Sequence, residues 1–173
     1  YLYSTVFNNL VANNGFAFFI VGSFLAIWII LYGIVQANTP KLLGLEGVNG
    51  GKILDILKVW LQRLTVVPVL LALCLLVINQ QNLTASLTLI IGLLIFGAMF
   101  AMISSLHSYL ILAFTNDNRV TLDVGFYYTA NALGRFLGTL LSGLTYQFGG
   151  IVFCLLTASV MLSASWLLTR NLR

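Results

Sequence analysis

This sequence contains few charged residues. They make up 7% of its 173 residues, whereas hydrophobic residues make up 60%. A soluble domain carries about 25% charged residues, so this scarcity excludes a soluble globular domain, and the mean hydropathy of +1.03 agrees. We therefore expect an integral membrane protein with one all-α domain over residues 1–173. The net charge of +4 then does not indicate nucleic-acid binding, because the positions of the charges matter more than their sum.

Histidine and cysteine are also few, and although serine and threonine are many, no group accompanies them that could activate a nucleophile. The sequence has one histidine, which excludes a two-histidine zinc motif, and no carboxylate lies within a predicted span to orient a catalytic base. Cys74 and Cys154 lack CxxC spacing; a thiol pair could bind a soft metal or trivalent arsenic, but small apolar residues are the preferred interpretation. The sequence thus predicts neither an enzyme nor a metal or cofactor site, and it favours a protein that moves a solute across the membrane.

Long apolar runs account for most of the chain. A membrane-spanning helix needs about 20 mainly apolar residues, and the sequence predicts five such spans and one shorter run. The short run is 1–11, and the spans are 15–37, 64–78, 86–114, 124–146 and 150–169. Because the chain begins inside an apolar pattern, we expect a six-helix unit with a truncated first helix.

The connections between these segments differ in charge. Seven of the eight Lys and Arg residues fall within 38–63, 115–123 or the C-terminal tail, whereas 8–14, 79–85 and 147–149 carry no charge. The positive-inside rule makes the charged side, with the C-terminus, cytoplasmic. Residues 53–63 place apolar side chains on one helical stripe, which predicts that the cytoplasmic loop 38–63 contains an amphipathic helix lying in the membrane interface.

The span 124–146 contains an arginine near its midpoint. Small residues recur every fourth position, which predicts a stripe for close helix packing. The stripe consists of Ala130, Gly134, Gly138 and Ser142. Asn131, Arg135 and Thr139 form a polar stripe beside it. An arginine at mid-membrane costs about 2.5–3.5 kcal/mol on insertion scales, so Arg135 should face water, a partner or an anion such as phosphate, arsenate or carboxylate. A structural or gating role for Arg135 is the alternative.

The span 86–114 adds three further candidate substrate-binding residues. Ser104 and Ser108 share a helix face, and His107 borders that face. A histidine here could carry a proton or donate a hydrogen bond to an anion. The alternative for His107 is a hydrogen-bonded packing residue.

Three stretches carry a resemblance to a known family. They are "WIILYGIVQANTPKL" (28–42), "SSLHSYLILAFT" (104–115) and "DVGFYYTANALGRFLGTLLSGLTYQ" (123–147). Together they resemble helices 7 to 12, with helix 7 truncated, of a major facilitator superfamily transporter. More narrowly, the chain is similar to the organoarsenical efflux permeases of bacterial arsenic-resistance operons.

The resemblance implies a function and a set of partners. Such permeases export 1-arseno-3-phosphoglycerate, which a glyceraldehyde-3-phosphate dehydrogenase makes when arsenate replaces phosphate. The resemblance therefore implies a multi-pass protein of the bacterial cytoplasmic (inner) membrane, an alternating-access antiporter, whose N-terminal six-helix half is missing here. The resemblance also implies three partners: a small anionic substrate, the lipid bilayer and, through a functional link, that dehydrogenase. The loop "NTPKLLGLEG" departs from the superfamily's usual cytoplasmic motif, because it lacks the motif's Asp and paired Arg.

Two other functions remain open from the sequence. The chain could belong to a superfamily transporter for another organic or phosphorylated anion. It could also be a non-transporting membrane scaffold, in which the small-residue stripe and Arg135 serve only helix association.

Overall fold

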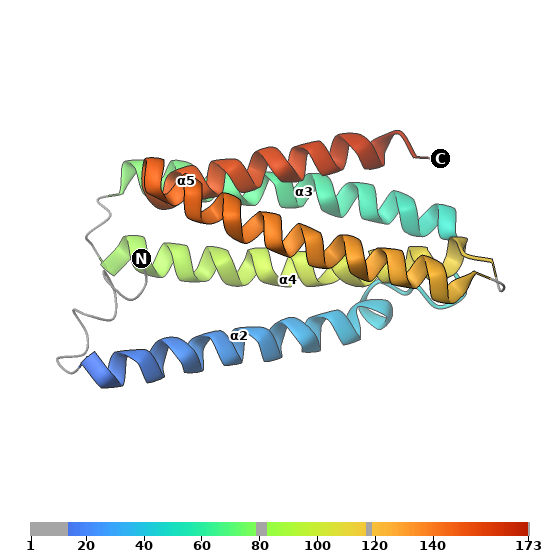
Figure 1. Ribbon diagram of the computed structural model, residues 1–173, viewed down its shortest axis with the longest axis horizontal. Helices are drawn as coiled ribbons and strands as arrows, with labels where there is room; N and C mark the ends of the chain where they lie inside the picture. The colour runs from blue at the N-terminus through green and yellow to red at the C-terminus, as the bar shows by residue number, and fades with distance from the viewer. Residues whose placement is uncertain (1–13, 79–82, 117–118, 173) are drawn as a thin grey trace.

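The computed structural model describes residues 14–78, 83–116 and 119–172, which are entirely helical apart from short connections (Figure 1). The four helices are α2 (Asn14–Leu42), α3 (Gly50–Val77), α4 (Leu83–Phe114) and α5 (Val120–Arg170). Each contains a stretch long and apolar enough to cross a membrane. By its helix composition the chain is therefore a multi-pass membrane protein.

The prediction of six helices is wrong for the described residues. The predicted spans 124–146 and 150–169 are both parts of α5, which contains non-helical backbone at Gly149 and Gly150. Figure 1 shows α5 doubling back, so that its first arm (120–148, orange) and its second arm (151–170, red) both run along the bundle. The predicted short helix at 1–11 lies outside the described residues.

The turn inside α5 depends on a glycine. Gly150 has φ +64° and ψ −155°, a backbone region that is essentially restricted to glycine. A Cβ atom at this position would strain the backbone even though it would meet no other atom within 4 Å. Gly150 therefore allows the two arms to follow each other in one tight hairpin.

The cytoplasmic loop predicted at 38–63 is also corrected by the structure. Helix α2 continues to Leu42, and α3 begins at Gly50 and runs unbroken to Val77. The predicted amphipathic segment 53–63 is thus the first part of a long helix. Its apolar stripe packs on Ile103 and Leu106 of α4, in a cluster with Leu57 and Leu61. The predicted stripe is therefore covered by a neighbouring helix, α4.

The connection between α2 and α3 begins with a helix-capping motif. The Leu45 amide donates to the Pro40 carbonyl at 2.9 Å and the Gly44 amide donates to the Lys41 carbonyl at 3.3 Å. These two bonds, with φ +60° at Gly44, form a Schellman motif, which satisfies carbonyls left free at a helix C-terminus. Leu45 is then buried in the apolar cluster, so the cap turns the chain towards α3.

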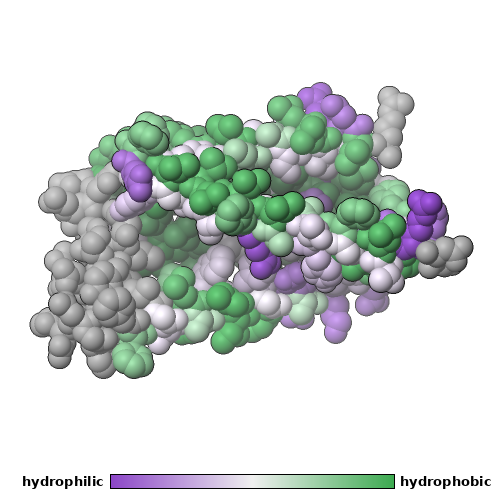
Figure 2. Space-filling model, viewed as in Figure 1, coloured by the Kyte–Doolittle hydropathy of each residue, from purple (hydrophilic) through white to green (hydrophobic). Residues whose placement is uncertain are grey.

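Charged residues gather at one end of this bundle. Helix α2 ends there, α3 begins there, and the α4–α5 connection lies there, with Thr115 donating a hydrogen bond to Asp123. The Lys58 ammonium donates to the Leu172 carbonyl at 2.8 Å, which brings the end of α5 to the same place. Figure 2 shows most of the hydrophilic surface at this end and hydrophobic surface over much of the remaining length.

Helix α2 contacts the bundle through a close approach to α4. A Cβ atom built on Gly97 would lie 2.7 Å from the Trp28 ring, and Trp28 stacks in turn on Tyr32. Tyr32 also contacts Phe100 of α4, with ring centroids 6.3 Å apart. Glycine at position 97 is therefore what lets the indole lie against the α4 backbone.

We expect Gly97→Ala to destabilise the fold by about 1–3 kcal/mol, because added atoms in a packed contact force shifts of side chains or backbone. Unfolding in a series of SDS–detergent mixtures measures this loss. Trp28→Phe, which shortens the ring, should restore part of it in the double variant. Gly33→Ala is the matched control, since a Cβ there meets nothing within 4 Å. Equal losses of stability in both variants would contradict the role of Gly97 in the contact with Trp28.

A polar contact joins α3 to the second arm of α5. The buried Ser159 hydroxyl donates to the Thr65 carbonyl at 3.1 Å. We expect Ser159→Ala to cost about 0.6 kcal/mol and at most about 1.7 kcal/mol, the range measured for such bonds between membrane helices. Ser163→Ala is the control in the same SDS titration, because Ser163 bonds only to Ser159 of its own helix among the described residues. No difference between the variants would mean that the bond does not stabilise the bundle.

Candidate functional site

Arg135 lies near the middle of the first arm of α5, and its side chain is exposed in the described chain. Among the described residues its guanidinium makes no ion pair and no hydrogen bond. All residues from 131 to 140 are exposed as well. This part of α5 therefore offers a permanent positive charge that the described chain leaves uncovered.

The position of Arg135 along the bundle follows from the contact that Tyr127, two turns earlier in α5, makes with α4. The Tyr127 hydroxyl lies 3.5 Å from the Ser108 hydroxyl of α4. Arg135 is about 12 Å further along the arm at 1.5 Å per residue, which brings it to about the level of Phe100 on the antiparallel α4. Phe100 is the residue that contacts Tyr32 of α2. Figure 2 shows a hollow between α2 and the first arm of α5.

The polar stripe around Arg135 contains one residue that sequence reasoning missed. Tyr127 precedes Asn131 by four positions, so it continues the row that Asn131 and Arg135 form. It is half-buried, whereas Asn131 is exposed. The four-residue spacing from Asn131 indicates that Tyr127 belongs to this row. A tyrosine near a helix end is, however, also typical of an interfacial anchor.

Thr139 differs from its neighbours on the stripe. Its hydroxyl lies 3.0 Å from the Arg135 carbonyl and 2.8 Å from the Phe136 carbonyl, and it donates its proton to this pair. A hydroxyl has a single proton to donate. Thr139 in this arrangement offers only acceptor lone pairs outwards, so Arg135 and Asn131 remain as the donors that suit an anion.

The three candidates on α4 separate into two groups. Ser108 donates to the Ser104 carbonyl at 3.2 Å and meets Tyr127 of α5, so Ser104 and Ser108 lie towards the first arm. His107 instead lines a cavity with residues of α3 and the end of α5. Its Nδ1 lies 3.0 Å from the Ile103 carbonyl. The structure thus connects the serine pair to the stripe of Arg135 and leaves His107 on a different face.

The small-residue stripe has little packed against it. Ala130, Gly134, Gly138 and Ser142 are all exposed, and a Cβ atom on Gly134 or Gly138 would meet nothing within 4 Å. Gly138 and Ser142 border a cavity of about 340 Å³ between α3, α4 and the arms of α5. The second arm reaches the stripe at Ser142, whose carbonyl accepts from the Cys154 thiol at 3.4 Å. Close packing along the rest of the stripe stays a prediction.

No family model, no curated protein and no solved structure matches this chain. The class that the fold defines is a multi-pass helical membrane protein, and its function is a matter for proposal.

Proposed function

We propose that the chain is part of a secondary-active transporter that carries a small anion across the membrane. The observation that supports this most is Arg135, an exposed guanidinium near the middle of a helix that is long and apolar enough to span the bilayer. A charge at such a depth is costly unless it faces water or a counter-ion. A transported anion would act as this counter-ion while it is bound to the protein.

From the resemblance we propose 1-arseno-3-phosphoglycerate as the substrate and the major facilitator superfamily as the class of transporter. This acyl arsenate carries phosphate and arsenate oxygens, which match the planar donor fork of arginine. Asn131, one turn away, adds amide donors, and the Tyr127–Ser108 pair borders the same stripe towards the charged end. In this proposal the charged end is cytoplasmic, by the positive-inside rule, in the inner membrane of a bacterium.

The test is the amount of arsenic retained by arsenate-loaded cells that make the gene product containing this chain. The cells are compared with and without a glyceraldehyde-3-phosphate dehydrogenase. Retained arsenic should fall only when both proteins are present, because the dehydrogenase supplies the acyl arsenate. Membrane levels of the product, followed by an epitope tag, are the control for expression.

Other results separate the alternatives. A fall in arsenic without the dehydrogenase would mean that arsenate itself is carried. No fall at normal membrane levels would overturn the organoarsenical substrate. Uptake and efflux assays with other phosphorylated anions would then distinguish another transporter from a scaffold, which would move none of them.

A further inference from the structure

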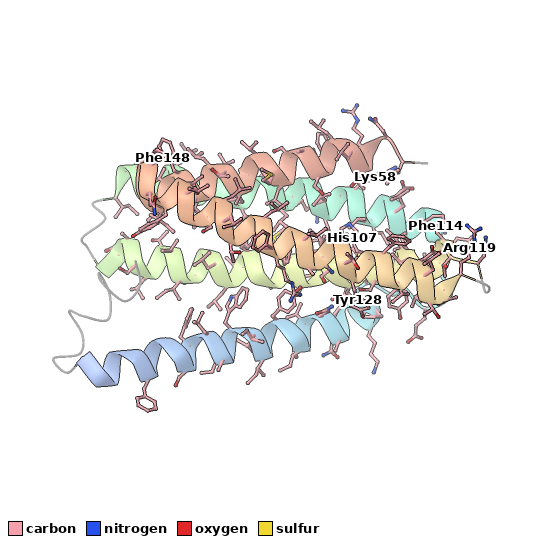
Figure 3. The ribbon with its side chains drawn as sticks, in the orientation of Figure 1. Lys58, His107, Phe114, Arg119, Tyr128 and Phe148 are labelled. Carbon is pink, nitrogen blue, oxygen red and sulfur yellow. The ribbon has the colours of Figure 1, made fainter. Side chains whose placement is uncertain are left out.

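A cavity of about 390 Å³ lies at the charged end of the bundle, on a different face from Arg135. Its walls are mainly apolar side chains from α3, α4 and the end of the chain. These are Leu54, Leu57, Leu110, Ile111, Phe114 and Leu172. Figure 3 shows Lys58, His107 and Phe114 in this half of the molecule. The cavity therefore lies where the apolar part of the bundle meets its charged end.

The polar groups inside this cavity are largely satisfied. Thr169 is buried, and its hydroxyl donates to the Ser165 carbonyl at 2.8 Å. His107 holds its Nδ1 against the Ile103 carbonyl, so a single ring nitrogen remains for any occupant. Apolar walls with satisfied polar groups suit a hydrocarbon, because a polar occupant would lose hydrogen bonds to water without replacing them.

A cation lies beside this apolar cavity. The Lys58 ammonium donates to the carbonyl of Leu172, a wall residue, at 2.8 Å. Its other neighbour is Asp55 at 3.7 Å, whose side chain is 79% exposed. The pair is weak because the carboxylate is largely in solvent and 3.7 Å away, and an ammonium has three N–H donors. Lys58 thus has capacity to bind a further anion next to the cavity.

We propose that the cavity holds an acyl chain of an anionic phospholipid, with the lipid phosphate against Lys58. The bilayer that surrounds the helices supplies both parts of this ligand, and basic pockets between membrane helices suit anionic head groups. The charge complementarity at Lys58 and the apolar walls select a lipid over a soluble anion. None of the residues of this site belongs to the Arg135 stripe, and His107, which lines the cavity, lies on a different face of α4 from Ser108.

The test uses the full chain purified in detergent and titrated with phosphatidylglycerol or phosphatidylcholine, with bound lipids counted by native mass spectrometry. We expect the chain to retain phosphatidylglycerol preferentially. Lys58→Gln should lower that preference about five-fold, the effect of one basic residue at a membrane surface. Lys52→Gln is the matched control, because Lys52 is an exposed lysine of the same helix that does not reach the cavity.

A second pair of variants tests the cavity itself. Ile111→Trp adds bulk at a half-buried wall position and should displace either lipid, whereas the neighbouring Leu112→Trp, at an exposed position outside the cavity, should not. Equal retention of the two lipids, equal effects of Lys58→Gln and Lys52→Gln, or normal retention in Ile111→Trp would each overturn the proposal. Glycerol phosphate, which has no acyl chain, should not bind; if it competes, the site is one for soluble phosphate.

Discussion

Replacing Arg135 with glutamine is expected to lower arsenic efflux about 10- to 100-fold in cells that make the dehydrogenase. A hydrogen bond to a charged group contributes about 1.5–3 kcal/mol, and each 1.4 kcal/mol corresponds to about a factor of ten. Glutamine keeps an amide donor on a shorter side chain and removes the charge. Arg135→Lys keeps the charge and loses the two-pronged fork, so we expect it to retain an intermediate rate.

The control for this prediction is another arginine on a spanning helix. Arg63 of α3 is exposed, and its guanidinium lies 5.5 Å from the centre of the Trp60 ring, one turn towards the charged end. Arg63→Gln should leave efflux unchanged at equal membrane levels, because this side chain is directed away from the middle of the bundle. Normal efflux in both Arg135 variants would contradict the anion-binding role and leave Arg135 a structural residue.

The second large effect is expected at the hairpin of α5. Gly150→Ala should destabilise the fold by about 1–3 kcal/mol, because the observed φ and ψ fall in a region that L-residues avoid. The loss should appear as unfolding at a lower SDS fraction, with the helical circular dichroism of the folded state retained before the transition. The effect has a backbone origin, since a Cβ atom at Gly150 would meet nothing within 4 Å.

Gly125→Ala provides the matched comparison for this variant. Gly125 lies in the first arm of the same helix, and its Cβ atom would also meet open space. Alanine is favoured over glycine inside a helix by about 0.8–1.0 kcal/mol, so Gly125→Ala should be neutral or stabilising. If Gly150→Ala behaved in the same way, position 150 would not have the positive φ on which the hairpin depends.

Much of the candidate site could be anticipated from spacing alone. The positions of Asn131, Arg135 and Thr139 on one row follow from helical geometry, and the row is found on the first arm of α5. Helical spacing does not reveal which protons are already used within the helix, and Thr139 gives its proton to the α5 backbone. Helical spacing also does not predict the contact between Tyr127 and Ser108, because that contact joins two helices.

The amino-acid composition and the order of apolar runs determined the class of the protein: the helices must satisfy their own backbone in lipid, and the charged residues must collect at one end. The tertiary structure decided where the helices continue and what covers them. The stripe of 53–63 is the same whether a membrane interface or α4 lies against it, so only packing could show that it belongs to α3. Similarly, 147–149 reads as a short connection in sequence, and the backbone angles of Gly149 and Gly150 show the tight turn between the two arms of α5. Local sequence sets which face of a helix is apolar, but the partner of that face is a long-range contact, which no local pattern specifies.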